Sequence, residues 1–255
     1  MVIYEDLDCV VISKPPGMVV NRAESVRAKT VQDWAERQAW FPSRTDDLIQ
    51  HLTDTELVRQ FFLRSGMVHR LDKDTSGALL LAKHPSAMQE LQRQFHDRET
   101  QKTYLALVHG QIEVNGATIV LPLGRSPETR GRFVVDPHGR HSETRYEVLV
   151  RVPSHEKDST GFSLVRLYPK TGRTHQLRVH MKHIGHPLVA DQLYLPKPRW
   201  QKDQLWCSRH WLHAAELQFA QPSSGESRKV VAPIPDDLKH ALSHLQLDIS
   251  HLSHL

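Results

Sequence analysis

The order of apolar and polar positions along the chain predicts short strands and helices in succession. Strands are expected where β-branched or continuous apolar runs end at turn residues, and helices where apolar residues recur every three or four positions. The predicted strands are residues 10–12, 18–20, 78–82, 104–108, 117–121, 132–135, 144–150, 162–168, 212–219 and 229–231. The predicted helices are two within residues 30–62, one from Pro85, one capped by Thr174 and ended by Gly185, and one at residues 236–245.

This succession predicts an α+β fold, with a large mixed, mainly antiparallel sheet flanked by helices. No repeat, low-complexity tract or long linker interrupts it, so we expect a single domain over residues 1–255. The composition, 39% hydrophobic and 24% charged, is typical of a soluble globular protein, and no apolar run reaches the length of a membrane span. Two cysteines far apart in sequence and an N-terminus without a signal-peptide core favour a cytoplasmic protein. The net charge of +4 permits a polyanionic partner.

The most informative segment is residues 69–77, His-Arg-Leu-Asp-Lys-Asp-Thr-Ser-Gly, which runs directly into the apolar stretch 78–82. Asp72 lies between cationic neighbours at the mouth of a predicted buried strand. Such a carboxylate can act as a nucleophile, as a general base or as a metal ligand. Asp74 follows two residues later, and a turn former is as good an interpretation of that pair as a catalytic dyad.

A metal site is the weaker interpretation. The chain has 18 histidines, but none lie in a metal-binding motif, and His175, His180 and His183 do not share one helical face. A second basic motif, residues 170–180, offers Asp72 a partner instead. If Arg178 lies within about 4–6 Å of Asp72, it lowers the pKa of that carboxyl by about 1–3. The alternative is that Arg178 covers its helix with its aliphatic stem.

Several segments together resemble the RluA branch of the RNA pseudouridine synthases, in the order of that family and over nearly the whole chain, from Ile3 to about Leu245. They are residues 13–17, 69–77 (His-Arg-Leu-Asp-x-x-Thr-Ser-Gly), 102–106 (Lys-x-Tyr-x-Ala), 172–180 (Gly-Arg-x-His-Gln-Leu-Arg-x-His), 185–191 and 212–214.

The resemblance implies that Asp72 is the catalytic aspartate, Tyr104 the active-site tyrosine and Arg178 the arginine that pairs with the aspartate. The implied reaction isomerises uridine in RNA to pseudouridine, by cleaving the glycosidic bond to N1 and rejoining the base through C5. It needs no cofactor and no metal. Attack on the base, attack on the sugar and a glycal route all stay open for the carboxylate. Tyr104 is expected to pack against the uracil.

The target uridine must leave its stack to reach the aspartate, which costs a few kcal/mol. By the same resemblance, Arg70 is expected to fill the space that the base leaves. The basic segment 125–145 is expected to form a hairpin that binds the RNA backbone, although a solvated loop is an equal alternative. The predicted RNA-contacting residues are Arg70, Arg125, Arg130, Arg132, Arg140, Arg173 and His175.

Two departures from the family pattern affect target choice. Residues 40–65 are expected to be a helical insertion, and the small N-terminal RNA-binding module of many relatives is not expected. Target choice then rests on the catalytic domain itself. We expect ribosomal RNA as the target, with transfer RNA as the alternative, and we expect a monomer. Two other classes fit parts of the sequence: an RNA-binding protein without catalysis, and a metal-dependent hydrolase that uses the histidines with Asp72.

Overall fold

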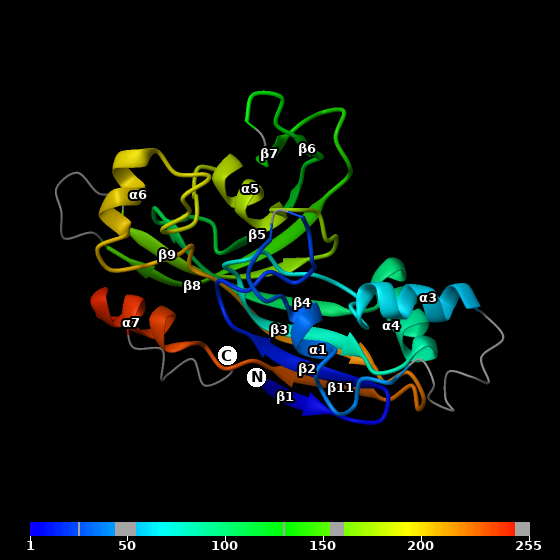
Figure 1. The fold of residues 1–255 in the computed structure, drawn as a ribbon. Coiled ribbons are helices and arrows are strands. Elements are labelled where there is room, and N and C mark those ends of the chain that lie inside the picture. The colour runs from blue at the N-terminus through cyan, green and yellow to red at the C-terminus, as the bar shows by residue number, and fades with distance from the viewer. Residues whose placement is uncertain (25, 44–54, 130, 154–160, 248–255) are drawn as a thin grey trace. The chain divides into compact units, whose positions relative to one another are not determined.

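The computed structural model describes residues 1–24, 26–43, 55–129, 131–153 and 161–247. The fold is of the α+β class with a large, mostly antiparallel sheet, as the hydropathy pattern predicts (Figure 1). The chain forms two compact units. The first contains Met1–Gln101 and Glu216–Pro233, and the second contains Lys102–Ala215 and Ile234–Leu255.

The strands of the first unit are β1 (Val2–Glu5), β2 (Cys9–Lys14), β3 (Ser76–Ala82), β11 (Ser227–Val231) and the end of β10 (Leu212–Ala220). β2 pairs antiparallel with β1 and with β3, and β11 pairs antiparallel with β10. Every residue of β3 is buried, which explains why its sequence is a continuous apolar run instead of an alternating one.

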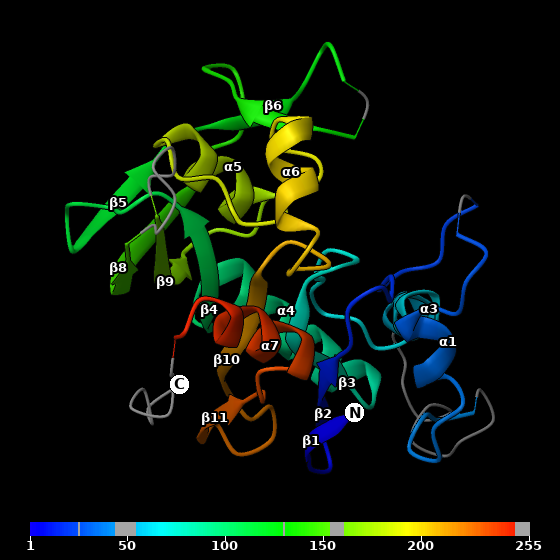
Figure 2. The ribbon, with the colours of Figure 1, turned by 90° about the vertical axis from the view of Figure 1, so that its left-hand side faces the viewer.

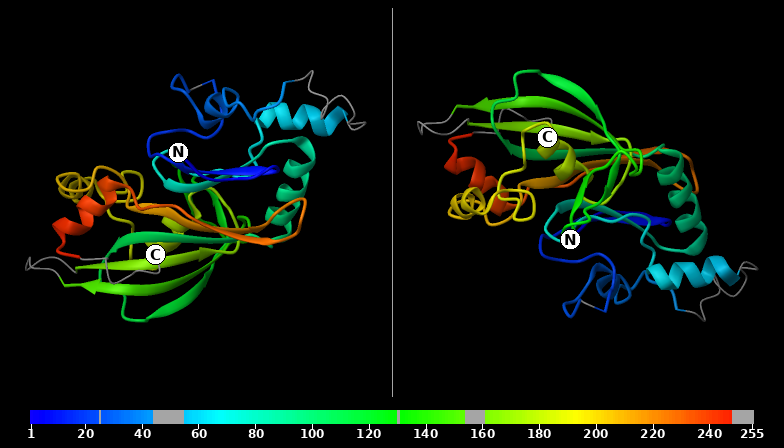
Figure 3. Two further views of the ribbon diagram at one scale, coloured as in Figure 1. Left: turned by 90° about the horizontal axis from the view of Figure 1, so that it is seen from below. Right: turned by 90° about the horizontal axis from the view of Figure 1, so that it is seen from above.

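The described residues of the first unit contain three helices: α1 (Val31–Ala35), α3 (Thr55–Arg64) and α4 (Pro85–Asp97). Gln32 joins the first two, because its side-chain amide donates to the carbonyl oxygen of Leu63 at 3.0 Å. Figure 2 shows α1 beside α3, and Figure 3 shows α3 beside α4. The core between helices and strands contains Phe61, Leu80 and Leu91, all fully buried.

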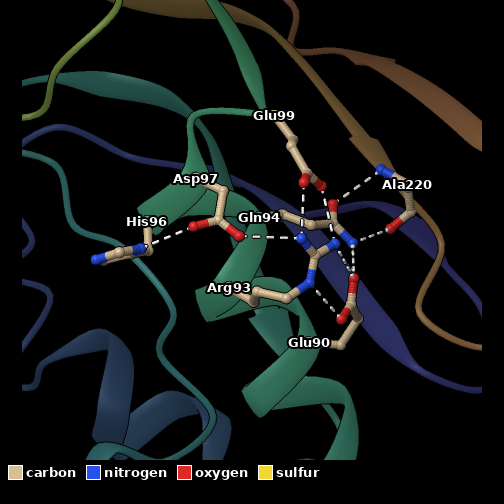
Figure 4. A network of polar contacts seen from close by, with 7 residues as sticks. All are labelled: Glu90, Arg93, Gln94, His96, Asp97, Glu99 and Ala220. Carbon is tan, nitrogen blue, oxygen red and sulfur yellow. Dashed lines mark hydrogen bonds and ion pairs between the residues drawn. The ribbon is translucent and has the colours of Figure 1, made fainter.

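The end of α4 carries a network of polar contacts (Figure 4). The guanidinium of Arg93 contacts three carboxylates on the surface, those of Glu90, Asp97 and Glu99. The neighbouring Gln94 is buried and attaches α4 to the end of β10, since its amide donates to the carbonyl of Ala220 at 2.9 Å and accepts from the Ala220 N–H at 3.0 Å.

The second unit contains the strands β4 (Gln101–His109), β9 (Phe162–Pro169), β8 (Glu143–Val152) and β5 (Gly116–Val120), antiparallel and adjacent in that order. A separate hairpin is formed by β6 (Leu123–Arg125) and β7 (Phe133–Val135), and it lies next to α5 (Gln176–His183) (Figures 1 and 2). The other helices of this unit are α6 (Lys197–Asp203) and α7 (Asp236–His244).

Several predicted elements differ from the structure. Residues 18–20 are not a strand: β2 pairs with β1, and the carbonyls of Val19 and Val20 accept the N–H groups of Val31 and Gln32 at the start of α1. α6 was not predicted, because its sequence has no apolar periodicity. α3 confirms helix at the end of the expected insertion, and residues 44–54 lie outside the described residues.

The cap of α5 also differs from the prediction. The residue at the N-cap is His175, in the left-handed region at φ 57°, and not Thr174.

No helix in the described ranges has the length and apolar character needed to cross a bilayer.

Candidate active site

The loop that carries Asp72 lies in the first unit between α3 and β3. Before the loop, Gly66 accepts the N–H of Ala82 at 2.8 Å and Met67 bridges to Leu81. After Asp72, the N–H of Thr75 donates to the Asp72 carbonyl at 3.2 Å, which turns the chain back into β3. The loop is therefore attached to one buried strand at both of its ends.

His69 fixes the first half of this loop. Its Nε2 accepts the backbone N–H of Leu80 at 2.9 Å, and its ring stacks on Phe95 with centroids 4.6 Å apart. The ring thus links β3, α4 and the loop. In the His-Arg-Leu-Asp sequence, the histidine has a structural contact that the sequence alone does not reveal.

Lys14 fixes the second half of the loop. Its side chain is fully buried at the end of β2, and its ammonium donates to the carbonyls of Pro15, Met18 and Lys73, each at 2.9 Å. A buried ammonium needs such hydrogen bonds to offset its desolvation. Lys14 therefore joins the turn after β2 to the residue that follows Asp72.

The result is a half-buried carboxylate on a loop fixed by neighbouring elements. Asp72 is partly exposed, Leu71 before it is buried at 5% exposure, and Arg70 and Lys73 are exposed. An acid in this setting has one accessible side and a fixed backbone. Both properties suit a group that reacts with a bound substrate.

In the second unit, Gln176 fixes the turn that precedes α5. Its Oε1 accepts from the Thr171 hydroxyl at 2.7 Å and from the Arg173 N–H at 3.0 Å. Its Nε2 donates to the carbonyl of Glu143 at 2.9 Å and to the hydroxyl oxygen of Thr144 at 3.0 Å. The start of α5 is therefore held against the start of β8.

Arg178, one turn into α5, forms a buried ion pair with Asp191. Its Nε lies 2.7 Å from Oδ2 and its Nη2 lies 2.8 Å from Oδ1. Their side chains are 8% and 0% exposed. Burial alone would raise the pKa of Asp191, but the hydrogen bonds and charge of Arg178 outweigh it and hold that pKa below its usual value.

This pair changes the interpretation of Arg178. The guanidinium does not simply cover the helix with its stem, because it is buried and held by two hydrogen bonds to a carboxylate. The sequence points to Asp191 only as the last residue of segment 185–191. The bidentate contact was not predicted, because Asp191 lies outside the helix that contains Arg178, and the sequence separation of the two residues then does not determine the distance between their side chains.

Tyr194 extends the same cluster. Its hydroxyl oxygen accepts the N–H of Phe133 at 3.0 Å and lies 3.0 Å from Nδ1 of His175. Burial raises the pKa of Tyr194 to about 12, so the phenol is neutral near pH 7. The β6–β7 hairpin is thereby hydrogen-bonded to the residues around α5.

Tyr104 lies on β4 opposite Leu167 of β9, half-buried and packed against the apolar cluster that includes Ala106 and Val165. Tyr104 and Arg178 both belong to the second unit, and Asp72 belongs to the first. The predicted catalytic residues are thus distributed over both units.

The predicted RNA-contacting residues that the structure describes occupy two kinds of position. Arg70, Arg125 and Arg140 are exposed, whereas Arg132, Arg173 and His175 are half-buried. Arg173 also donates from Nε to the carbonyl of His141 at 3.2 Å. Arg130 lies outside the described residues. Across the described part of the chain, no three His, Cys, Asp or Glu side chains are grouped as metal ligands.

Comparison with known proteins places these residues in a family context. Residues 8–183 match the family described as "RNA pseudouridylate synthase", a range that includes Asp72, Tyr104 and Arg178. A relative in Bacillus subtilis, an uncharacterized RNA pseudouridine synthase, is 35% identical over 243 residues, covering 95% of this chain and 72% of the relative. The "ribosomal large subunit pseudouridine synthase D" of Nitrosomonas europaea is 34% identical over 248 residues, covering 96% of this chain and 65% of the relative.

Solved structures give the same result. The human RNA pseudouridylate synthase domain containing 1 is similar with a TM-score of 0.65 and 28% identity, over 92% of this chain and 83% of that chain. The human RNA pseudouridylate synthase domain containing 4 shares the fold, with a TM-score of 0.69 and 22% identity, over 97% of this chain and 93% of that chain.

Proposed function

The chain belongs to the family of RNA pseudouridine synthases, isomerases that convert uridine in RNA to pseudouridine, and we propose that Asp72 is its catalytic carboxylate. In this reaction the bond between N1 and C1′ breaks and a bond between C5 and C1′ forms. The hydrogen of C5 leaves as a proton and N1 gains one, so no atom is lost and no oxidant is needed.

The observation that carries the proposal is the setting of Asp72 within the family match. The carboxylate is half-buried on a loop that Lys14, His69 and Met67 attach to buried strands. A surface turn would not need three such attachments. Fixed placement lowers the entropic cost of bringing a reacting group to its substrate.

We assign Arg178 as the partner of Asp72, as the family motifs imply. The ion pair with Asp191 supports this assignment, because it fixes the guanidinium in one orientation. A positive charge held in place stabilises an ionised carboxylate nearby. Tyr104 is assigned to pack against the uracil ring. The assignment covers attack on the base, attack on the sugar and a glycal route, since each uses the side chain of Asp72.

The target base reaches Asp72 after leaving its stack in structured RNA, at a cost of a few kcal/mol. Arg70 is two residues before Asp72 and exposed, which supports a role in filling the space that the base leaves. The exposed Arg125 and Arg140 are assigned to backbone phosphates, together with Arg130, Arg132, Arg173 and His175.

Ribosomal RNA is the proposed target. Several relatives of similar identity are named ribosomal large subunit pseudouridine synthase D, among them those of Nitrosomonas europaea, Neisseria meningitidis and Xanthomonas campestris. We further propose that the protein acts as a monomer in the cytoplasm. The location is supported by two buried free thiols, those of Cys9 and Cys207, because free thiols favour a reducing compartment.

The proposal predicts a specific pattern of products. The purified protein, incubated with transcribed large-subunit ribosomal RNA, is expected to form pseudouridine at one or a few uridines, with and without a chelator. Because product and substrate have the same mass, the RNA is first treated with a carbodiimide that forms a stable adduct with pseudouridine, and mass spectrometry of nuclease fragments then locates the adduct. Transcribed transfer RNA serves as the parallel substrate.

Each other outcome has a distinct meaning. Product in transfer RNA alone contradicts the ribosomal assignment. Loss of product with chelator favours a metal-dependent enzyme, and tight RNA binding without product favours a binding protein.

A further inference from the structure

Three cationic side chains surround the ring of Tyr194 in the second unit. The guanidinium carbons of Arg178 and Arg132 lie 5.0 Å and 5.3 Å from the ring centroid, and Nζ of Lys182 lies 5.8 Å from it. They come from two parts of the chain. Arg132 directly precedes β7, and Arg178 and Lys182 belong to α5. Cation–π contacts offset part of the repulsion between these charges.

The charges of this cluster do not balance. Asp191 contributes one negative charge to this cluster, through its bidentate contact with Arg178. Within the ranges that the structure describes, neither Arg132 nor Lys182 forms an ion pair with a carboxylate. Moreover, Nε of Arg132 is buried and has no hydrogen-bond acceptor among the described residues. A buried donor without an acceptor is costly, and a guanidinium is suited to an anion with several oxygens.

The electrostatics of Lys182 agree with an excess of positive charge. Burial and the neighbouring charge of Arg132 lower the pKa of Lys182, and Asp191 opposes them only in part. A bound anion would relieve this repulsion.

The hairpin holds Arg132 in place. The N–H of Phe133, the next residue, donates to the hydroxyl of Tyr194, and the Phe133 ring packs edge-on against His175 with centroids 5.8 Å apart. Arg132 is therefore positioned by its own backbone neighbour, and the cluster is built before any ligand arrives.

We propose that Arg132 and Lys182 form a binding site for one backbone phosphate of the RNA, beside the ring of Tyr194. This inference rests on the proposed function for the identity of the ligand, and it adds Lys182 and Tyr194 to the residues that engage RNA. Arg132, which is half-buried, supplies the directed donors of its planar guanidinium, and Lys182 supplies a more exposed charge.

The first test is the salt dependence of RNA binding. Affinity for a transcribed RNA hairpin is measured by fluorescence anisotropy across a potassium chloride series. Arg132→Met and Lys182→Met are each expected to reduce the slope of log Kd against log salt by part of the about 0.7–0.9 that one phosphate contact contributes. Arg132→Lys is expected to keep the slope but to weaken binding, because it retains the charge and loses the directed donor.

Lys239→Met is the matched control. Lys239 is an exposed helix lysine in the same unit, paired with Asp236, so its loss removes the same charge away from the cluster. The control is expected to bind RNA with the wild-type slope. Equal slopes for wild type, Lys182→Met and Lys239→Met would overturn the inference, and Lys182→Met decides the matter if Arg132→Met fails to fold.

The second test locates the phosphate. A neutral methylphosphonate is moved one position at a time along the hairpin. Wild-type protein is expected to lose affinity at one position where Lys182→Met, which keeps only Arg132 at the site, loses less. The same loss for both proteins at every position would contradict the site.

Failure of this inference is distinct from failure of the proposed function. Wild-type protein that forms pseudouridine, with slopes unchanged in both variants, contradicts the phosphate site alone. Wild-type protein that forms no pseudouridine in any RNA, with slopes reduced as expected, contradicts the proposed function and supports the site.

Discussion

At the scale of single residues, the buried ion pair between Arg178 and Asp191 fixes the arginine that we propose as the partner of Asp72. Both side chains are buried, so removal of the carboxylate leaves an uncompensated guanidinium. Asp191→Asn is expected to lower the free energy of unfolding by about 3–5 kcal/mol in urea denaturation at pH 7. Glu216→Gln, which breaks a more exposed pair with Lys229 at 3.0 Å, is expected to cost less than about 1 kcal/mol.

The same pair gives a pH dependence of known sign. The pKa of Asp191 is lowered in the folded protein from its model-peptide value of 3.8, so its stabilisation is fully present above pH 3.8. That stabilisation is lost as the pH falls through the folded pKa. The difference in stability between wild type and Asp191→Asn should therefore shrink toward low pH, and a difference that grows on acidification would contradict this assignment.

Motifs that resemble the family select Asp72, Tyr104 and Arg178 as candidates, and their roles stay predictions. The motifs do not reveal the residues that hold these side chains in place. Lys14 reaches the carbonyl of Lys73, 59 positions away in sequence, and His69 acts through a backbone N–H of β3. Contacts of this kind depend on strand pairing that no local pattern encodes.

At the scale of elements, prediction succeeded where burial dominates. The buried strand β3 and the helix α4 appear where their apolar residues indicated. Prediction failed where polar contacts determine the residue at which an element starts. The side chain of Gln176 accepts hydrogen bonds from the Thr171 hydroxyl and the Arg173 N–H, so α5 starts after His175 and Thr174 stays exposed. The short polar helix α6 has no apolar stripe to reveal it.

The junction of β2 with the Asp72 loop gives a prediction at this scale. Lys14→Met is expected to keep the fold and the RNA affinity but to lower the turnover number by about 10–100-fold, because Lys73 loses its attachment and Asp72 shifts. Faster amide hydrogen exchange at residues 72–76 should accompany the loss.

Lys83→Met is the control for this change. Lys83 follows β3 directly and also binds a backbone carbonyl, that of Asp6, at 2.7 Å. It is expected to leave turnover and exchange in the loop unchanged. If Lys14→Met weakens RNA binding while turnover stays normal, Lys14 is not a positioning residue.

At the scale of the whole molecule, the division into two units left no trace in the sequence. The boundaries fall after Gln101 and after Ala215. Both positions lie inside strands, β4 and β10, and the sequence of a strand does not have the composition of a linker. The single catalytic domain over residues 1–255 therefore stays a prediction, as do the helical insertion and the absence of an N-terminal module. Family membership, by contrast, extends over most of the chain.

We propose that Asp72 carries out the isomerisation of uridine, and the release of the C5 hydrogen tests this proposal. Formation of the bond between C5 and C1′ displaces the hydrogen of C5, so RNA labelled with tritium at C5 of uridine releases tritium in proportion to product. Single-turnover release, with protein in excess over the ribosomal RNA transcript, measures the chemical step.

Asp72→Asn is expected to slow tritium release by at least about 100-fold, the contribution of one acid–base group or more. Asp74→Asn, the matched change two residues along the same loop, is expected to stay close to the wild-type rate, and both variants should bind RNA as the wild type does. Near-normal release from Asp72→Asn, or equal losses in the two variants, would contradict the account.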